Sequence, residues 1–331
     1  MRRLVKKEDL VKLIDSLLKE FEIIAPKELS GKGIFYQVLE DSKDLYLGQD
    51  FAIEPIKKFF LEPSSWILRH AKDDVSVESF LQSDKKRIVI GARPCEARGL
   101  TLLDKLFNSE YKDDFYINNR NRTIVIGLAC AKPDESCFCT SMQGSPVETS
   151  GMDALILETI DSRVQSTEYR FILEIITDRG EDLFGSIGEE FKEDLKSHKE
   201  KLKTLVKKEI KTPDNMDKVF ESDYWVEVSR SCISCGICTF LCPTCHCFDL
   251  VDEEQKRLRC YDGCSCPDFT LEASGVNPRP TKKERYRQRV YHKFDYFKKN
   301  FGENLCVGCG RCIRHCPVKI DIADIVDKIP C

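Results

Sequence analysis

Two short runs of cysteines with the same spacing constrain this chain more than any other feature of its sequence. In each run, three cysteines are separated by pairs of residues, and a fourth cysteine follows after three more residues and precedes a proline. The cysteines are Cys232, Cys235, Cys238 and Cys242 in the first run and Cys306, Cys309, Cys312 and Cys316 in the second. With 18 cysteines in 331 residues and no apolar signal segment at the start, we interpret these thiols as metal ligands and not as disulfides.

The spacing is that of bacterial two-cluster ferredoxins, in which each [4Fe–4S] cluster takes three thiolates from one run and the fourth from the other run. One cluster is thereby assigned to Cys232, Cys235, Cys238 and Cys316. The other cluster is assigned to Cys306, Cys309, Cys312 and Cys242. Structural zinc is the alternative, but zinc sites usually use two separated Cys-x2-Cys pairs. The sequence therefore predicts two [4Fe–4S] clusters.

The overall charge and hydropathy exclude several other classes of protein. The chain has 52 basic and 56 acidic residues and a net charge of −4, which gives no overall attraction to nucleic acid or to an anionic membrane. Its longest apolar runs, such as 88–90 and 154–157, have the length of strands and not of a membrane span. We expect a cytoplasmic protein with no nucleic-acid partner and no membrane span.

Residues 1–180 are predicted to form an α/β domain with a mostly parallel sheet. Helical spacing of apolar residues over 9–21 is followed by strand-like segments that alternate with helical ones. The predicted strands are 33–39, 87–90, 123–126, 154–157 and 169–176. Segments 87–90 and 123–126 are rich in β-branched residues, as is typical of strands buried on both faces of a parallel sheet.

A second group of cysteines follows these two strands. Cys95 comes shortly after the first strand and Cys130 after the second, and Cys137 and Cys139 lie close behind Cys130. Loops beyond the carboxyl ends of parallel strands meet at one edge of the sheet. We predict that these four thiols hold a third [4Fe–4S] cluster; a redox-active or simply buried set of cysteines is the alternative.

Beyond residue 180 the character of the chain changes twice. Residues 181–222 are rich in Lys and Glu with apolar residues at helical intervals, which predicts a solvated helical connector. Residues 223–331 are predicted to form a two-cluster ferredoxin-like α+β domain with a long insert, 243–305. In the insert, Cys245, Cys247 and Cys264 are candidate additional ligands, and the alternative is that they are buried reduced thiols. No role is assigned to Cys260, Cys266 or Cys331.

A basic stretch, 279–299, lies between the two cysteine runs. Its cations alternate with aromatic residues, a pattern that also occurs in RNA-binding segments. The cations are Lys282, Lys283, Arg285, Arg287, Arg289, Lys293, Lys298 and Lys299. Beside thiolate-bound clusters, we interpret the stretch as compensating their negative charge or as binding an acidic partner.

No known nucleotide-binding or catalytic motif is present. The chain lacks a G-x-G-x-x-G fingerprint, a P-loop, a nucleophile elbow and a zinc-protease helix. We therefore expect no catalytic residues, no bound flavin and no bound nicotinamide in this chain.

Several short motifs together resemble one known family. They are Arg93-Pro94-Cys95, Cys137-Phe138-Cys139, Cys242-Pro243-Thr244-Cys245-His246-Cys247, Arg285-Tyr286-Arg287, His292-Lys293-Phe294 and Cys306-Val307-Gly308-Cys309-Gly310-Arg311-Cys312. The family is that of the iron–sulfur β subunits of cytoplasmic sulfhydrogenases. It includes the A subunit of anaerobic sulfite reductase and related subunits of flavin oxidoreductase complexes that feed heterodisulfide reductase.

The resemblance implies an electron-transfer subunit. Its partners would be a flavoprotein that reacts with NAD(P)H and a catalytic redox subunit of the hydrogenase, sulfite reductase or heterodisulfide reductase type. A free-standing iron–sulfur oxidoreductase and a redox-sensing scaffold are the alternatives. The resemblance does not identify the terminal acceptor or the direction of electron flow.

Overall fold

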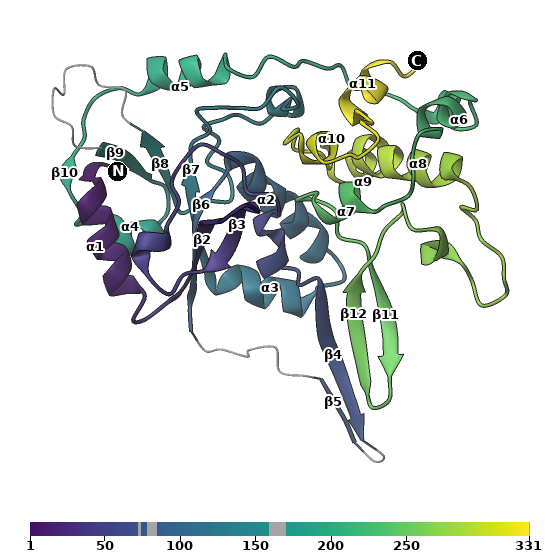
Figure 1. The fold of residues 1–331 in the computed structure, drawn as a ribbon, viewed down its shortest axis with the longest axis horizontal. Coiled ribbons are helices and arrows are strands. Elements are labelled where there is room, and N and C mark those ends of the chain that lie inside the picture. The colour runs from purple at the N-terminus through teal and green to yellow at the C-terminus, as the bar shows by residue number, and fades with distance from the viewer. Residues whose placement is uncertain (72–73, 78–84, 159–169, 331) are drawn as a thin grey trace. The chain divides into compact units, whose positions relative to one another are not determined.

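The computed structural model describes residues 1–71, 74–77, 85–158 and 170–330 (Figure 1). The chain forms two compact units that interleave along the sequence. The first unit comprises residues 1–56, 83–134 and 144–207, and the second comprises 57–82, 135–143 and 208–331. The predicted domains, 1–180, 181–222 and 223–331, are each continuous in sequence. In the structure, segments 57–82 and 135–143 belong to the second unit although the segments on both sides of them belong to the first.

An eight-stranded sheet forms the centre of the first unit, in the order β10-β1-β9-β8-β7-β6-β2-β3. The strands are β1 (Arg2–Lys6), β2 (Glu22–Leu29), β3 (Gly33–Val38), β6 (Arg87–Ala92), β7 (Thr123–Leu128), β8 (Ala154–Glu158), β9 (Arg170–Ile175) and β10 (Glu189–Glu190). Strands β2, β6, β7 and β8 are parallel, as predicted for β6 and β7. The outer pairings are antiparallel, so the sheet is mixed. Tyr169, the predicted start of β9, lies outside the described residues.

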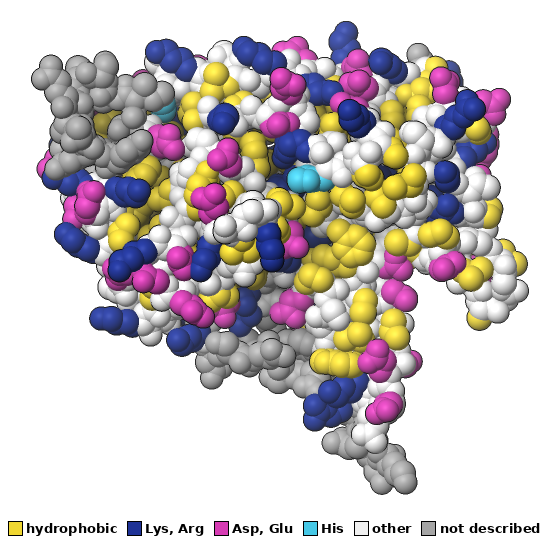
Figure 2. All heavy atoms as spheres, viewed as in Figure 1, with side chains coloured by type: hydrophobic (Ala, Val, Ile, Leu, Met, Phe, Trp, Pro, Cys, Tyr) yellow, Lys and Arg dark blue, Asp and Glu magenta, His cyan; other side chains and the backbone are white. Residues whose placement is uncertain are grey.

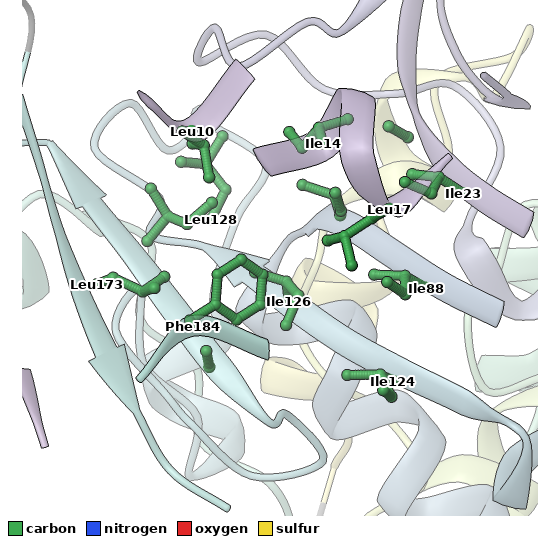
Figure 3. Close-up of a cluster of buried hydrophobic side chains, with 14 of the residues drawn as sticks. Leu10, Ile14, Leu17, Ile23, Ile88, Ile124, Ile126, Leu128, Leu173 and Phe184 are labelled. Atoms are coloured by element: carbon green, nitrogen blue, oxygen red, sulfur yellow. The ribbon is translucent and has the colours of Figure 1, made fainter. Parts of the chain in front are cut away.

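Helices cover both faces of this sheet. Helix α1 (Lys7–Leu17) and helix α4 (Asp178–Phe184) pack on one face, where Ile14 and Phe184 join a buried cluster with Ile88 and Ile126 (Figure 3). Side chains alternate along a strand, so Val89 and Val125 point to the opposite face. Helices α2 (Pro94–Phe107) and α3 (Asp114–Asn121) contact β7 there.

The predicted helical connector is helical only in part. It contains the end of α4, helix α5 (Lys196–Lys203) and a 3₁₀ turn at Asp217–Val219, with β10 between the first two. Residues 204–216, all of which the structure describes, form no helix or strand. Pro213 lies in this stretch, and its missing N–H and fixed φ oppose a continuous helix.

The second unit contains a four-stranded antiparallel sheet in the order β11-β12-β4-β5. Its strands are β4 (Ser64–Ala71), β5 (Asp74–Val77), β11 (Phe248–Glu253) and β12 (Lys256–Tyr261). Figure 2 shows hydrophobic side chains at the surface of this sheet, where Leu250 and Val251 are exposed. The insert therefore contains a β-hairpin, β11–β12, that the sequence analysis did not predict.

The second unit contains several short helices, and Trp225 lies in the buried core that some of them form. They are α6 (Tyr224–Ser229), α7 (Ile237–Phe240), α8 (Lys282–Tyr291), α9 (Phe297–Phe301), α10 (Arg311–Arg314) and α11 (Ile322–Asp327). A π-helical segment, His292–Tyr296, joins α8 to α9. Thr281 and Glu284 form a capping box at the start of α8, and Gly302 with φ +81° ends α9. Among the described helices, none has the length and apolar character needed to cross a bilayer.

The two cysteine runs have the same backbone conformation at corresponding positions. Ser234 and Gly308 have φ of +56° and +63°, two residues after the first cysteine of each run. Gly236 and Gly310 have φ of +77° and +71° and begin α7 and α10. Such left-handed positions favour glycine, and they turn backbone N–H groups toward a common concave side.

Gly308 gives the first test of this arrangement, with Gly302 as its matched control. A Cβ on Gly308 would lie 2.5 Å from the carbonyl carbon of Phe138 and 2.6 Å from the backbone nitrogen of Cys139. A Cβ on Gly302, which also has positive φ, would meet nothing within 4 Å. We expect Gly308→Ala to lower the free energy of unfolding by about 3 kcal/mol and Gly302→Ala by about 1 kcal/mol. Anaerobic denaturant titration measures both, and equal losses would contradict the backbone clash.

Candidate metal centre

A cavity in the second unit brings together the cysteines that the spacing assigned to one cluster. Its walls include Cys232, Cys235, Cys238 and Cys316, together with Cys312 of the second predicted set. The first three lie before and within α7, whereas Cys316 follows α10 in the other run. The set that shares this cavity therefore combines both runs.

Arg289 shows what kind of group fits this cavity. It lines the cavity from α8 and is only 3% exposed. Its Nη1 donates to Cys245 Sγ at 3.3 Å, whereas its Nη2 is buried without a hydrogen-bond partner. A buried guanidinium with an unsatisfied N–H is costly unless an anion lies beside it. A thiolate-bound [4Fe–4S] cluster is such an anion, so these residues fit the group.

The second predicted set, Cys306, Cys309, Cys312 and Cys242, also gathers in the second unit. Burial raises the pKa of Cys306 to about 12, and Cys242 and Cys309 lie close enough to raise it further. Burial also raises the pKa of Cys312, again with Cys309 and Cys242 nearby. Thiols in such surroundings deprotonate readily only when a metal or a cation compensates the charge.

Lys293 supplies a cation to this second set. Its Nζ donates to Cys242 Sγ at 3.2 Å, to Thr244 Oγ1 at 3.0 Å and to the Leu305 carbonyl at 3.3 Å. These contacts use the donor capacity of the ammonium group, which is 3% exposed. Burial opposes the charge, but Cys242 and Cys245 raise the pKa of Lys293 above its ordinary value. Lys293 is therefore charged and directed at a cysteine of the second predicted set.

Cys242 and Cys245 form a contacting pair with pKa shifts in opposite directions. A hydrogen bond from Cys245 lowers the pKa of Cys242, burial opposes this shift, and the charges of Lys293 and Arg289 lower the pKa further. The same contact raises the pKa of Cys245. Cys242 is thus prepared for metal ligation, which is the role that the spacing predicts for it.

Lys57 is a third buried basic residue near these thiols, and no pattern in the sequence identified it. It lies in the 3₁₀ turn Ile56–Phe59, is 2% exposed, and its Nζ donates to the Cys245 carbonyl at 2.8 Å. Burial lowers the pKa of Lys57, and the nearby Cys245 and Cys242 oppose this shift. The rings of His246 and His292 are 5.1 Å apart. Burial lowers the pKa of His246 to about 3 and that of His292 to about 4, so both are neutral at pH 7. The local positive charge therefore comes from lysine and arginine.

The other cysteines of the insert have different surroundings. Cys247 and Cys264 lie close enough to interact electrostatically, and burial raises the pKa of Cys264 to about 11. Cys260 lies on β12 with its Sγ 3.8 Å from Ser64 Oγ, and Cys266 lies beside Asp262. Within the described residues, no three His, Cys, Asp or Glu side chains are grouped to bind a single metal ion. A ligand role for Cys245, Cys247 and Cys264 stays a prediction.

The cysteines predicted to hold a third cluster are distributed over both units. Cys95 begins α2 and Cys130 follows β7 in the first unit. Cys137 and Cys139 belong to the second unit, where the Phe138 N–H donates to the Gly308 carbonyl at 2.9 Å. Arg314 Nη1 lies 3.7 Å from Cys137 Sγ. The third cluster stays a prediction from sequence.

Arg93 explains how the loops that carry Cys95 and Cys130 are held in the first unit. Its Nη2 donates to the carbonyls of Gly48, at 2.7 Å, and Asp50, at 3.1 Å. Its Nη1 donates to the Ala129 carbonyl at 3.2 Å, next to Cys130. The buried guanidinium thus joins the ends of β6 and β7 to the loop 48–50.

Comparisons with known proteins agree with the dicluster interpretation. Residues 231–320 match the family described as a 4Fe-4S dicluster domain. The chain is 33% identical over 306 residues to sulfhydrogenase 2 subunit beta of Pyrococcus furiosus, which corresponds to 89% of this chain and 88% of that protein. An uncharacterized protein of Methanocaldococcus jannaschii is 40% identical over 42 residues, 13% of this chain and 17% of that protein. No solved structure matches the chain.

The Arg93 contacts lead to a test of the first unit. Arg93→Met leaves the buried Ala129 carbonyl and the part-buried carbonyls of Gly48 and Asp50 without their donor, so we expect the free energy of unfolding to fall by about 2–4 kcal/mol. Lys105→Met on the exposed side of α2 is the control and should change it by less than about 0.5 kcal/mol. Thermal and denaturant unfolding of the anaerobic protein measure the difference. Equal effects of the two substitutions would exclude a structural role for the Arg93 network.

Proposed function

This chain belongs to the family of sulfhydrogenase iron–sulfur β subunits, and we propose that it relays electrons between two other subunits of a cytoplasmic complex. One neighbour is a flavoprotein that reacts with NAD(P)H. The other is a catalytic redox subunit of the hydrogenase, sulfite reductase or heterodisulfide reductase type. The chain itself binds neither flavin nor nicotinamide in this proposal.

The cavity that combines Cys232, Cys235 and Cys238 with Cys316 is the observation that carries this proposal. A [4Fe–4S] cluster supplies one-electron chemistry when it is bound. Around it, the protein contributes thiolates, buried cations and an apolar wall that includes Ile320 and Ile322. Such an arrangement stores and passes electrons, and no binding motif for an organic substrate accompanies it.

The proposed ligand sets follow the crossed arrangement of the two runs. Cys316 joins the cluster of the first run, and Cys242 joins the cluster of the second run. Cys316 lines the same cavity as the three cysteines of the first run, which supports this assignment, and Cys312 also reaches that cavity. We propose that Cys95, Cys130, Cys137 and Cys139 bind a third cluster, on the sequence arguments alone.

Pairs of cysteine variants test the crossed assignment. In the crossed arrangement, Cys242→Ala and Cys309→Ala remove the same cluster, and Cys316→Ala and Cys235→Ala remove the other. Each variant should lose about four irons per chain and one of the two electron paramagnetic resonance signals that belong to these runs. The measurement is anaerobic iron analysis with spectra of the reduced protein.

Cys260→Ala is the matched control, because Cys260 lies on strand β12 beside Ser64 and outside both predicted sets. It should keep the full iron content and both signals. If Cys242→Ala instead removes the same signal as Cys235→Ala, each cluster takes its four ligands from one run and the crossed assignment is wrong.

Reduction by a partner tests the relay. The purified chain should oxidise NAD(P)H negligibly and contain no stoichiometric flavin, because no dinucleotide-binding motif is present. After addition of the flavoprotein subunit purified from the same source, NAD(P)H should reduce the clusters. The loss of visible absorbance measures this reduction. Stoichiometric flavin in the isolated chain, or rapid NAD(P)H oxidation without a partner, would favour a free-standing enzyme.

A further inference from the structure

The two cysteine runs have matching backbones but different surroundings. Ile233 and Val307 occupy the same position, one residue after the first cysteine of each run. Ile233 is 56% exposed, whereas Val307 is 2% exposed. Cys235 and Cys309 are also equivalent, and Cys235 is exposed whereas Cys309 is partly buried. The first run is therefore open at its middle, and the second run is covered there.

A segment of the chain itself covers the second run. The Phe138 N–H donates to the Gly308 carbonyl at 2.9 Å, and Ser136 Oγ donates to the Gly310 carbonyl at 3.4 Å. The approach is so close that a Cβ on Gly308 would lie 2.5 Å from the Phe138 carbonyl carbon. The Phe138 side chain is buried in the core of the unit. A run of this kind is thus covered by a loop, 136–139, that contributes backbone hydrogen bonds and one large apolar side chain.

The first run has no counterpart of this loop in the part of the chain that the structure describes. The Ser234 carbonyl, which corresponds to that of Gly308, accepts no hydrogen bond from the described residues. Phe240 is 41% exposed and packs beside Gly236, where its ring would lie 3.1 Å from an added Cβ. Gly236, Ile233 and Cys235 line one cavity. We call Ile233, Cys235 and Phe240 the open surface of the first run.

We propose that the open surface is the docking site of a redox partner subunit, whose contact segment carries a large apolar side chain with carboxylates beside it. This inference rests on the proposed function and adds the place of contact. Single exposed apolar residues are ordinary, but Ile233 and Phe240 lie beside an exposed cysteine that is a proposed cluster ligand. A partner bound there lies close to a cluster, and electron transfer is faster over a shorter distance.

Two exposed cations flank the open surface in sequence. Arg230 lies two residues before Cys232, and Lys319 directly follows Val318. Cys232 and Val318 both line the cavity of the first run. Neither cation forms an ion pair with any residue that the structure describes. Charge complementarity therefore favours a partner with carboxylates at the edge of its contact segment.

The acidic residues of the same two segments, 227–231 and 317–324, do not cancel this charge. Both aspartates of 317–324 form ion pairs with Lys208. Glu227 is the remaining acidic residue, and it is exposed one turn before Arg230. Two unpaired cations thus outnumber one unpaired carboxylate in these segments.

Electron transfer with each partner subunit, followed by stopped-flow absorbance, tests the docking site. The full chain is mixed with the flavoprotein subunit and NAD(P)H to follow cluster reduction, and the reduced chain is mixed with the catalytic subunit to follow reoxidation. Ile233→Asp places a negative charge in the apolar contact and repels the partner's carboxylates. We expect it to raise the concentration of at least one subunit that gives the half-maximal rate by about tenfold. Arg230→Glu should lower the same rate about threefold at low salt, and the effect should vanish at about 1 M salt.

Val38→Asp is the matched control, because Val38 is 50% exposed at the end of β3 in the first unit. It should change neither rate. Iron content and the two resonance signals show whether each variant keeps its clusters. If Ile233→Asp loses iron, Arg230→Glu decides the question, since Arg230 lies outside both cysteine runs.

The outcomes separate this inference from the proposed function. Variants with full iron that exchange electrons with both subunits as the wild type does would overturn the docking site. A wild-type chain that exchanges electrons with neither subunit would instead refute the proposed function.

Discussion

The buried contact between positive side chains and cysteine sulfur is the interaction on which the second unit depends. Lys293 donates to Cys242 Sγ, and Arg289 donates to Cys245 Sγ while it also lines the cavity of the first run. Moving these cations out of water costs several kcal/mol each unless an anion compensates them. Cysteine thiolates, and the clusters that they bind, are the anions that lie next to these cations. The same contacts that make this interior stable therefore also prepare it for iron–sulfur clusters.

The helical segment 282–301 organises these contacts. Its start is fixed by the capping box of Thr281 and Glu284, and its apolar side packs through Tyr286 and Val290 on the core around Trp225. Arg289 and Lys293 are four residues apart, so both face the cysteines from successive turns. The π-helical segment begins between them, and such irregular turns are common at functional sites. One helical segment thus packs on the apolar core and also carries the buried cations beside the cysteines.

The first unit is stabilised by a different balance of forces. Its sheet is covered on one face by α1 and α4, and apolar contacts such as those of Ile14 and Phe184 dominate there. Buried polar contacts add to this core: Arg93 connects the loop 48–50 to Ala129, and Asp153 accepts hydrogen bonds from the Val125 N–H and from Thr177 Oγ1. An α/β sheet usually binds its ligands in the loops at the carboxyl ends of its strands. In this unit an apolar core supports the sheet, and hydrogen bonds hold the loops at the ends of β6 and β7. The family membership and the dicluster domain support an electron-transfer role for the chain as a whole.

The sequence by itself determined the cysteine runs, the family and the central strands, because ligand spacing and β-branched runs are local properties of the chain. It also indicated that the basic stretch compensates cluster charge or binds an acidic partner, but it could not say which cations are buried beside the cysteines. In the tertiary structure Arg289 and Lys293 are buried and Lys282 is exposed. Lys57, from a distant segment of the chain, is also buried. The tertiary structure likewise placed Cys316 in the cavity of the first run and formed β11–β12 from an insert without a clear periodic pattern. The physical reason is that burial and charge pairing arise from contacts between segments far apart in sequence, which no local pattern records.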